Sequence, residues 1–178
     1  MRVISGKFRG KKLKSFEGQD IRPTSDRAKE SIFNIINAKI EGSSFLDLFC
    51  GTGSMGIEAL SRGANKVVFT DIDYKSVKLT NENLKSVKQD IVAIKSSAEN
   101  YLSSCSQKFD IIFLDPPYAY DKVDILISLI VKNSLLNKDG IIIYEHKSDR
   151  QSQEFEKVQL TSVRKYGIAV FDFYKVEE

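Results

Sequence analysis

The chain has 178 residues, of which 42% are hydrophobic and 29% are charged, and this balance is typical of one folded domain. Its two cysteines, Cys50 and Cys105, match no zinc-site spacing and are too few for a disulfide framework. The chain has no signal-like start and no apolar run long enough to span a bilayer. We therefore expect a cytoplasmic monomer that does not enter a membrane.

The net charge of +3 comes from the N-terminus. Residues 1–16 contain six basic side chains and no acidic one, whereas the other 162 residues carry 21 basic and 24 acidic side chains. Counterion release draws such a segment to polyanions, which makes nucleic acid a candidate partner. A solvated face that keeps the protein soluble explains the charge equally well. The six residues are Arg2, Lys7, Arg9, Lys11, Lys12 and Lys14.

The start of the chain predicts a hairpin followed by a helix. A short β-like segment leads into Gly6 and Gly10, and this spacing predicts a tight β-hairpin. Cap-type residues after Pro23, with Asp26 in the first turn, indicate a helix start. Apolar residues then recur on one helical face, which extends the helix to about Ile40. These are Ala28, Ile32, Ile35 and Ile36.

From residue 42 onward, short apolar runs alternate with helical segments, which indicates a parallel sheet covered on both faces. Two β-like segments around Gly167 predict an antiparallel hairpin at one edge. We expect a single α/β domain, residues 1–178, with a basic N-terminal hairpin and helix (1–41) and a catalytic core (42–178) built on a mostly parallel, seven-stranded Rossmann-like sheet. Expected strands cover 44–49, 66–70, 91–95, 109–114, 140–145, 158–165 and 168–176. Expected helices cover 54–62, 74–87 and 121–131, and a short turn is expected near 99–104.

A glycine-rich turn follows the first expected core strand. Gly51, Gly53 and Gly56 form a G-x-G-x-x-G pattern, and Asp71 follows Gly51 by 20 residues, where a ribose-binding acid belongs. A dinucleotide would place its pyrophosphate here, but Asp47 would repel that anion. An acid at this position suits a ligand with a cationic sulfonium and a free amino group, which favours S-adenosylmethionine over NAD.

Three further residues belong to the expected cofactor site. Cys50 is a small residue within the glycine turn, suited by its size. Ser97 and Ala98 follow the third core strand, at the edge of the sheet where an adenine ring is held in this kind of fold. Because Ser97 has only a hydroxyl group, the contact that it predicts with adenine is weak.

The fourth core strand runs directly into Asp115, Pro116, Pro117 and Tyr118. The two prolines stiffen the loop and lack N–H groups, which leaves their carbonyl groups as acceptors. An amino group on a base could donate to the Asp115 carboxylate and the Pro116 carbonyl, so that its lone pair becomes available for attack. Tyr118 offers a ring on which an extruded base could stack. The alternative is a plain strand-terminating turn.

Taken together, these motifs resemble the bacterial 16S ribosomal-RNA guanine-N2 methyltransferases of the RsmD type. The resemblance covers almost the whole chain. Its broadest motif, Asp-Pro-Pro-Tyr, is shared with adenine-N6 and cytosine-N4 enzymes, whereas the others are narrower. They are the Gly-x-x-Arg-Gly start, Arg22-Pro23-Thr24-Ser25-Asp26-Arg27, Phe33-Asn34, Asp47–Gly51, Gly56-Ile57-Glu58-Ala59-Leu60-Ser61-Arg62-Gly63-Ala64 and Leu114–Tyr118.

The resemblance implies a class I methyltransferase that uses S-adenosylmethionine, without a metal, on a guanine of small-subunit ribosomal RNA within a ribosomal particle. It implies that Asp47, Gly51 and Gly53 hold the methionine end, that Asp71 holds the ribose, and that residues 115–118 hold the guanine. The N-terminal segment would grip RNA. The residues expected to contact RNA are Arg2, Lys7, Arg9, Lys11, Lys12, Arg22, Thr24, Arg27 and Pro117.

Alternatives remain at this stage. An adenine-N6 methyltransferase acting on RNA or DNA would use the same residues, and a non-catalytic RNA-binding protein would need only the basic N-terminus. A nicotinamide-dependent dehydrogenase would leave Asp47 and the Pro-Pro-Tyr loop without a role. His146, the one histidine, lies at a strand end and is expected to have no chemical role.

Overall fold

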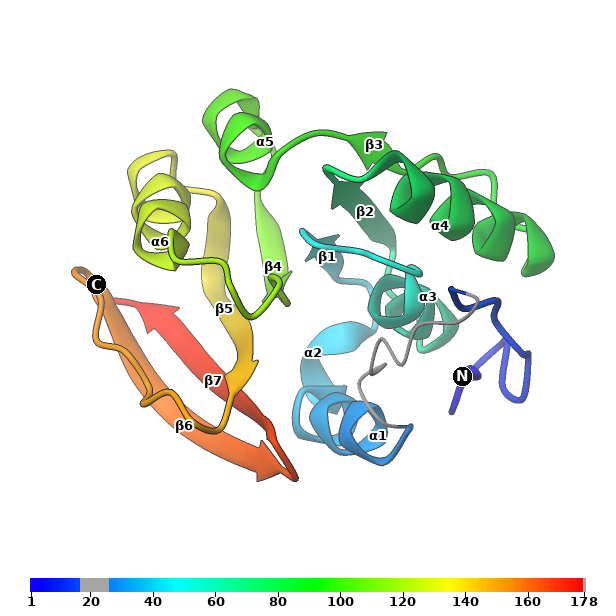
Figure 1. Ribbon diagram of the computed structural model, residues 1–178, viewed down its shortest axis with the longest axis horizontal. Coiled ribbons are helices and arrows are strands. Elements are labelled where there is room, and N and C mark those ends of the chain that lie inside the picture. The colour runs from blue at the N-terminus through cyan, green and yellow to red at the C-terminus, as the bar shows by residue number, and fades with distance from the viewer. Residues whose placement is uncertain (17–25, 178) are drawn as a thin grey trace.

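The computed structural model describes residues 1–16 and 26–177. A seven-stranded sheet with helices on both faces forms the body of this part of the chain (Figure 1). The strands are β1 Ser44–Asp47, β2 Lys66–Asp71, β3 Ile94–Lys95, β4 Phe109–Leu114, β5 Leu136–Lys147, β6 Val158–Tyr166 and β7 Ala169–Val176. The helices are α1 Asp26–Ile35, α2 Asn37–Ile40, α3 Ser54–Ser61, α4 Tyr74–Ser86, α5 Ala98–Ser104 and α6 Val123–Lys132.

The strand order is β3-β2-β1-β4-β5-β7-β6. The first five strands in this order pair in parallel, whereas β7 pairs antiparallel with both β5 and β6. This arrangement confirms the predicted α/β class, with a mostly parallel sheet and an antiparallel C-terminal hairpin. The order reverses around β1, so the crevice at the carboxyl ends of β1 and β4 is the place where such a sheet binds a ligand.

The central strands send alternate side chains into two separate cores. Phe45 of β1 and Ile111 of β4 belong to one core, whereas Leu46 and Ile112 belong to the other. The first core lies against α1–α4 and the second against α5 and α6, so helices cover both faces of the sheet (Figure 1). Burial on both faces explains why these strands are unbroken apolar runs in the sequence.

Three predicted element boundaries are wrong. The helix expected to run to Ile40 is interrupted at Ile36, whose φ of −94° and ψ of 8° depart from helical values. The third strand has two residues rather than five, because the Ala93 N–H donates to the Asn81 side chain of α4 at 2.8 Å instead of to a strand. Strand β5 begins at Leu136, before the expected start, beside a register irregularity.

The predicted N-terminal β-hairpin is present in a minimal form, closed by backbone hydrogen bonds that join residues 1 and 3 to residues 10, 11 and 13. Residues 1–13 form a closed loop with a single antiparallel bridge, between Arg2 and Lys12, rather than two strands. Gly6 and Gly10 both have a φ of +80°, as their predicted role in turns requires. The backbone N–H groups of Ile4 and Ser5 donate to the Glu58 carboxylate of α3, at 2.8 and 3.0 Å, so they are not available for a strand ladder.

His146 lies near the end of β5 and is buried. Its Nε2 atom lies 3.0 Å from Asp172 Oδ2 on the neighbouring strand β7. Burial opposes the charged imidazole, but the hydrogen bonds to Asp172 and to the Lys147 carbonyl outweigh it and raise the pKa of His146. This contact between β5 and β7 gives His146 a structural role within the sheet.

None of the helices in the described part of the chain has the length and apolar character of a membrane span.

Candidate active site

A cavity of about 710 Å³ opens at the carboxyl ends of β1, β2 and β4. Loops that follow the first four strands supply most of its wall, and the N-terminal segment and β5 supply one residue each. Its volume is within the range of a small-molecule site. The wall consists of Phe16, Leu48, Phe49, Gly51, Asp71, Ile72, Asp73, Ser76, Ser96, Ser97, Ala98, Glu99, Asp115, Pro116, Pro117, Tyr118, Tyr120 and Glu145.

The glycines of the β1–α3 turn have different structural tasks. Gly51 has a φ of +52°, and a Cβ atom there would meet nothing within 4 Å, so its backbone borders open space at the cavity wall. A Cβ on Gly53 would lie 2.8 Å from the Thr80 methyl group, and one on Gly56 would lie 2.2 Å from the Phe69 ring. Gly53 and Gly56 therefore allow close packing of α3, and Gly51 leaves room for a ligand.

Asp47 and Cys50 lie beneath the cavity rather than in its wall. The Asp47 carboxylate is 1% exposed and accepts the Gly56 N–H at 2.9 Å. Burial, with a further contribution from the charge of Asp71, raises the pKa of Asp47 to about 7. The Cys50 thiol lies 3.4 Å from the Thr80 hydroxyl, and burial raises its pKa well above the usual value. The predicted contacts of both residues with a cofactor stay predictions.

Asp71 ends β2 and lies in the cavity wall. Its two carboxylate oxygens accept the N–H groups of Gly51 and Asp73, each at 2.9 Å, so this acid joins the glycine turn to the start of α4. Burial raises the pKa of Asp71, and these backbone hydrogen bonds oppose that effect. Asp73 caps α4 by accepting from the N–H groups of Lys75 and Ser76. The predicted role of Asp71 in ribose binding stays a prediction.

The third loop contains an acid that sequence reasoning missed. Ser97 lies in the wall, but its hydroxyl group accepts the Asn100 N–H at 3.2 Å as the cap of α5. Glu99 also lies in the wall and accepts a hydrogen bond from the Tyr120 hydroxyl at 2.9 Å. This loop therefore carries a carboxylate two residues after Ser97, where the sequence alone indicated only a hydroxyl group. The sequence signal that could have identified Glu99 is an acidic residue in the first turn of the helix that follows the third strand.

Asp115, Pro116, Pro117 and Tyr118 all lie in the cavity wall, as predicted from their place after β4. Pro116 is buried and Tyr118 is 40% exposed. The loop is held by its own turn, in which the Tyr120 N–H donates to the Pro117 carbonyl at 2.7 Å. Arg150 adds hydrogen bonds to the carbonyl groups of Tyr118 and Tyr120, at 2.5 and 3.2 Å. The geometry of the tetrapeptide is thus fixed from two sides.

The cavity wall is rich in acidic side chains. Among its described residues there are five carboxylates and no lysine, arginine or histidine. Burial of the Asp115 carboxyl group, together with the charges of Glu145 and Asp47, raises the pKa of Asp115 well above its usual range. Such a wall disfavours a dinucleotide pyrophosphate and suits a cationic ligand. The five acids are Asp71, Asp73, Glu99, Asp115 and Glu145.

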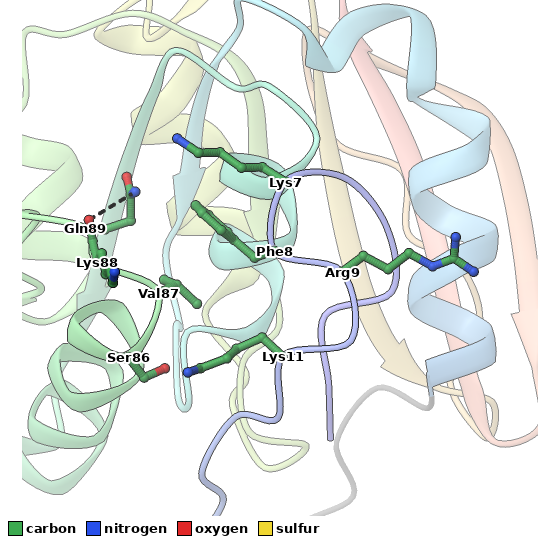
Figure 2. Close-up of a pocket in the computed structure, with 8 residues that line it drawn as sticks. All are labelled: Lys7, Phe8, Arg9, Lys11, Ser86, Val87, Lys88 and Gln89. Atoms are coloured by element: carbon green, nitrogen blue, oxygen red, sulfur yellow. Dashed lines mark hydrogen bonds between the residues drawn. The ribbon is translucent and has the colours of Figure 1, made fainter.

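Of the predicted RNA-contacting residues, Pro117 lies in this cavity wall and the other described ones lie elsewhere on the protein. Arg2, Arg9 and Arg27 border a hollow beside the start of α1. Lys7 and Lys11 border a second hollow at the end of α4 (Figure 2), and Lys12 is exposed. Arg22 and Thr24 lie outside the described residues. In residues 1–16 and 26–177, no group of three or more metal-ligating side chains could hold a metal ion.

Comparisons with known proteins match nearly the whole chain. The model of the family described as Conserved hypothetical protein 95 matches residues 1–175. YlbH of Bacillus subtilis is 41% identical over 183 residues and covers 98% of each chain. A Haemophilus influenzae protein named ribosomal RNA small subunit methyltransferase D is 34% identical over 180 residues, with 98% of this chain and 93% of the relative covered.

A solved structure also matches nearly the whole chain. The structure of yhhF from Escherichia coli has a TM-score of 0.89 and 26% identity, and it covers 100% of this chain and 98% of that chain. Family model, relatives and fold thus match over nearly the whole length of this chain. The chain belongs to the Conserved hypothetical protein 95 family, the RsmD family of ribosomal RNA methyltransferases.

Proposed function

We propose that the chain transfers a methyl group from S-adenosylmethionine to the exocyclic N2 amine of a guanine in small-subunit ribosomal RNA. The observation that carries this proposal is one negatively charged cavity in which the ribose-type acid Asp71 and the Asp115–Tyr118 loop share a wall. The relatives named ribosomal RNA small subunit methyltransferase D support ribosomal RNA as the substrate. The choice of guanine N2 rests on the family resemblance.

The residues present fit the methyl donor. Gly51 leaves open space beside the cavity, and Asp71 offers carboxylate oxygens to ribose hydroxyl groups. Ile72, which is 66% exposed, offers an apolar face for an adenine ring, with Glu99 in the next loop as an acceptor for its amino group. When bound, S-adenosylmethionine supplies an electrophilic methyl group on a cationic sulfonium. The negative wall favours that cation electrostatically.

The Asp115 loop is suited to hold the amine of the base. The Asp115 carboxylate and the Pro116 carbonyl would accept its two N–H groups, which orients the nitrogen lone pair. Tyr118, which is 40% exposed, would stack against the extruded ring. The raised pKa of Asp115 also suits it to take up the proton that the amine loses on methylation. Such fixed acceptors need no rearrangement during the reaction.

The proposal can be tested in a strain that lacks this protein. We expect mass spectrometry of its 16S ribosomal RNA to show the loss of one N2-methylguanosine, because this chain would methylate that guanine. The natural gene should restore the modified nucleoside, and a gene encoding Asp115→Ala should not. Unchanged N2-methylguanosine together with the loss of an N6-methyladenosine would instead support the adenine alternative.

A further inference from the structure

We propose that Glu145, where β5 reaches the cavity, is the residue that selects guanine as the target base. The Glu145 carboxylate accepts the N1–H group of the extruded base, while Asp115 and Pro116 hold its N2 amine. This inference rests on the proposed function, because it takes a guanine as the substrate and the Asp115 loop as its binding site. It adds the residue that decides between bases.

The register of the sheet places Glu145 beside Asp115. Strands β4 and β5 lie side by side in parallel, and Leu114 pairs with Tyr144 (Figure 1). Asp115 and Glu145 follow these two residues, so they lie at the same level of two chain segments that are about 4.8 Å apart. Both residues line the cavity, and the charge of Glu145 contributes to the raised pKa of Asp115. Two carboxyl groups are therefore presented to the cavity side by side.

Glu145 interrupts an apolar strand at the point where that strand reaches the cavity. Residues 141–144 of β5 are buried and hydrophobic, and the partner of Glu145 on β7 is the fully buried Phe171. Glu145 itself is only 6% exposed. Burial among such neighbours costs a carboxyl group hydration free energy. An acid at this position therefore indicates a role in the cavity rather than in the packing of the sheet.

The other acids of the cavity wall belong to the side proposed for the methyl donor. Asp71 ends β2, Asp73 follows it, and Glu99 follows β3. In the strand order β3-β2-β1-β4-β5, strand β1 lies between these acids and the loop after β4. Among the described residues of the wall, Asp115 and Glu145 are therefore the two acids on the side proposed to receive the base.

Guanine presents two adjacent hydrogen-bond donors that match this pair of acids. Its N1–H group lies next to its N2 amine on the Watson–Crick edge, which is the edge that base-flipping enzymes read. An ionised carboxylate is an acceptor only, so Glu145 can pair with N1–H while Asp115 pairs with the amine. Both donors, together with the sulfonium cation, favour the ionised form of the two carboxyl groups. Two neighbouring acceptors thus fit two neighbouring donors.

Adenine and cytosine do not offer this pattern of donors. In either base the ring nitrogen beside the amine, N1 of adenine or N3 of cytosine, carries no hydrogen and is itself an acceptor. It would face the Glu145 carboxylate with no proton between them, which leaves two acceptors unpaired in a buried place. The Asp115 loop alone recognises an amine, which all three bases possess. Glu145 therefore supplies the discrimination that the loop lacks.

The test uses a 16S ribosomal RNA in which the guanosine that accepts the methyl group is replaced by 2-aminopurine riboside. This base keeps the N2 amine, but its N1 atom carries no hydrogen. The ratio of kcat/KM for the guanosine RNA to kcat/KM for the 2-aminopurine RNA is measured for the natural chain and for Glu145→Gln. We expect the ratio to fall by about 10- to 100-fold in Glu145→Gln, because the neutral amide can accept from N1–H or donate to a bare N1.

Loss of folded protein would not change this ratio, because both RNAs are compared on one preparation. Asp139→Asn, which alters an exposed acid of the same strand, is the matched control and should keep the natural ratio. An unchanged ratio in Glu145→Gln would overturn the inference and leave the proposed function in place. Equal kcat/KM of the natural chain for the two RNAs would overturn it as well, and this comparison needs no variant. No transfer to the guanosine RNA by the natural chain would overturn both proposals.

Discussion

Replacing Asp115 with alanine is expected to lower kcat of methyl transfer by roughly 10²–10³-fold, because a fixed acceptor aimed at a reacting group contributes about that much. The Pro116 carbonyl remains in the wall, so part of the orienting effect should remain. Kd for S-adenosylmethionine should stay within about threefold, since the donor side of the cavity is built by other loops. Steady-state kinetics with isothermal calorimetry of donor binding measure both quantities.

Loss of folding would not account for the lower kcat of Asp115→Ala. Because the pKa of Asp115 is raised in the folded state, its ionisation opposes folding at any pH above its unfolded value of about 3.9. Alanine removes that opposition, so Tm at pH 8 should not fall. Asp115→Asn keeps the shape but not the charge and should be similarly slow. Asp139→Asn, an exposed acid in β5, is the matched control. Transfer by Asp115→Ala at the natural rate would refute the assigned role.

The second large effect is expected at Asp71. Asp71→Asn should raise Kd for S-adenosylmethionine by about 10- to 100-fold, because each lost hydrogen bond to a charged group is worth about 1.5–3 kcal/mol. The carboxylate also holds the N–H groups of Gly51 and Asp73, so the substitution loosens the turn that borders the cavity. Calorimetry at constant pH measures the loss. Asp139→Asn again serves as the control, and unchanged affinity in Asp71→Asn would contradict the ribose assignment.

The affinity for S-adenosylmethionine should depend on pH. A cationic ligand favours ionised carboxylates, so binding lowers the raised pKa values of Asp71 and of Asp47, which is about 7 without ligand. Affinity should therefore fall as the pH is lowered from 8 to 6, because Asp47 takes up a proton near pH 7. In Asp71→Asn this dependence should remain, because it comes from Asp47. Affinity that rises toward pH 6 would contradict the electrostatic account of the cavity.

Much of the catalytic cavity could be predicted because its residues follow strands directly. Asp71 ends β2 and Asp115 follows β4, and parallel strands bring their carboxyl ends to one edge. Glu145 could not be found this way. It lies within the apolar run of β5, and only the order β1-β4-β5 brings it beside Asp115. Phe16 was missed as well, because its place in the wall depends on the non-local contact between Lys14 and Asn83.

The structure explains why the motif Gly56–Ala64, in and after α3, contains buried polar residues. Sequence patterns treat Glu58 and Ser61 as two polar residues of an amphipathic helix. In the structure both are buried and bind backbone groups of the N-terminal loop. Arg62 and Lys29 contact the same carboxylate of Glu58, at 2.8 and 3.5 Å. The contacts of Glu58 and Ser61 with the N-terminal loop join residues more than 50 positions apart, so local periodicity could not predict them.

The most direct test of the account is a reconstituted reaction. The purified chain, methyl-labelled S-adenosylmethionine and unmethylated 16S ribosomal RNA, naked and in small-subunit particles, are incubated, and the RNA is digested to nucleosides for mass spectrometry. The account predicts that the label appears as N2-methylguanosine at a single position. Label on another nucleoside, on the ribose or on protein, or no transfer to either form of the RNA, would contradict it.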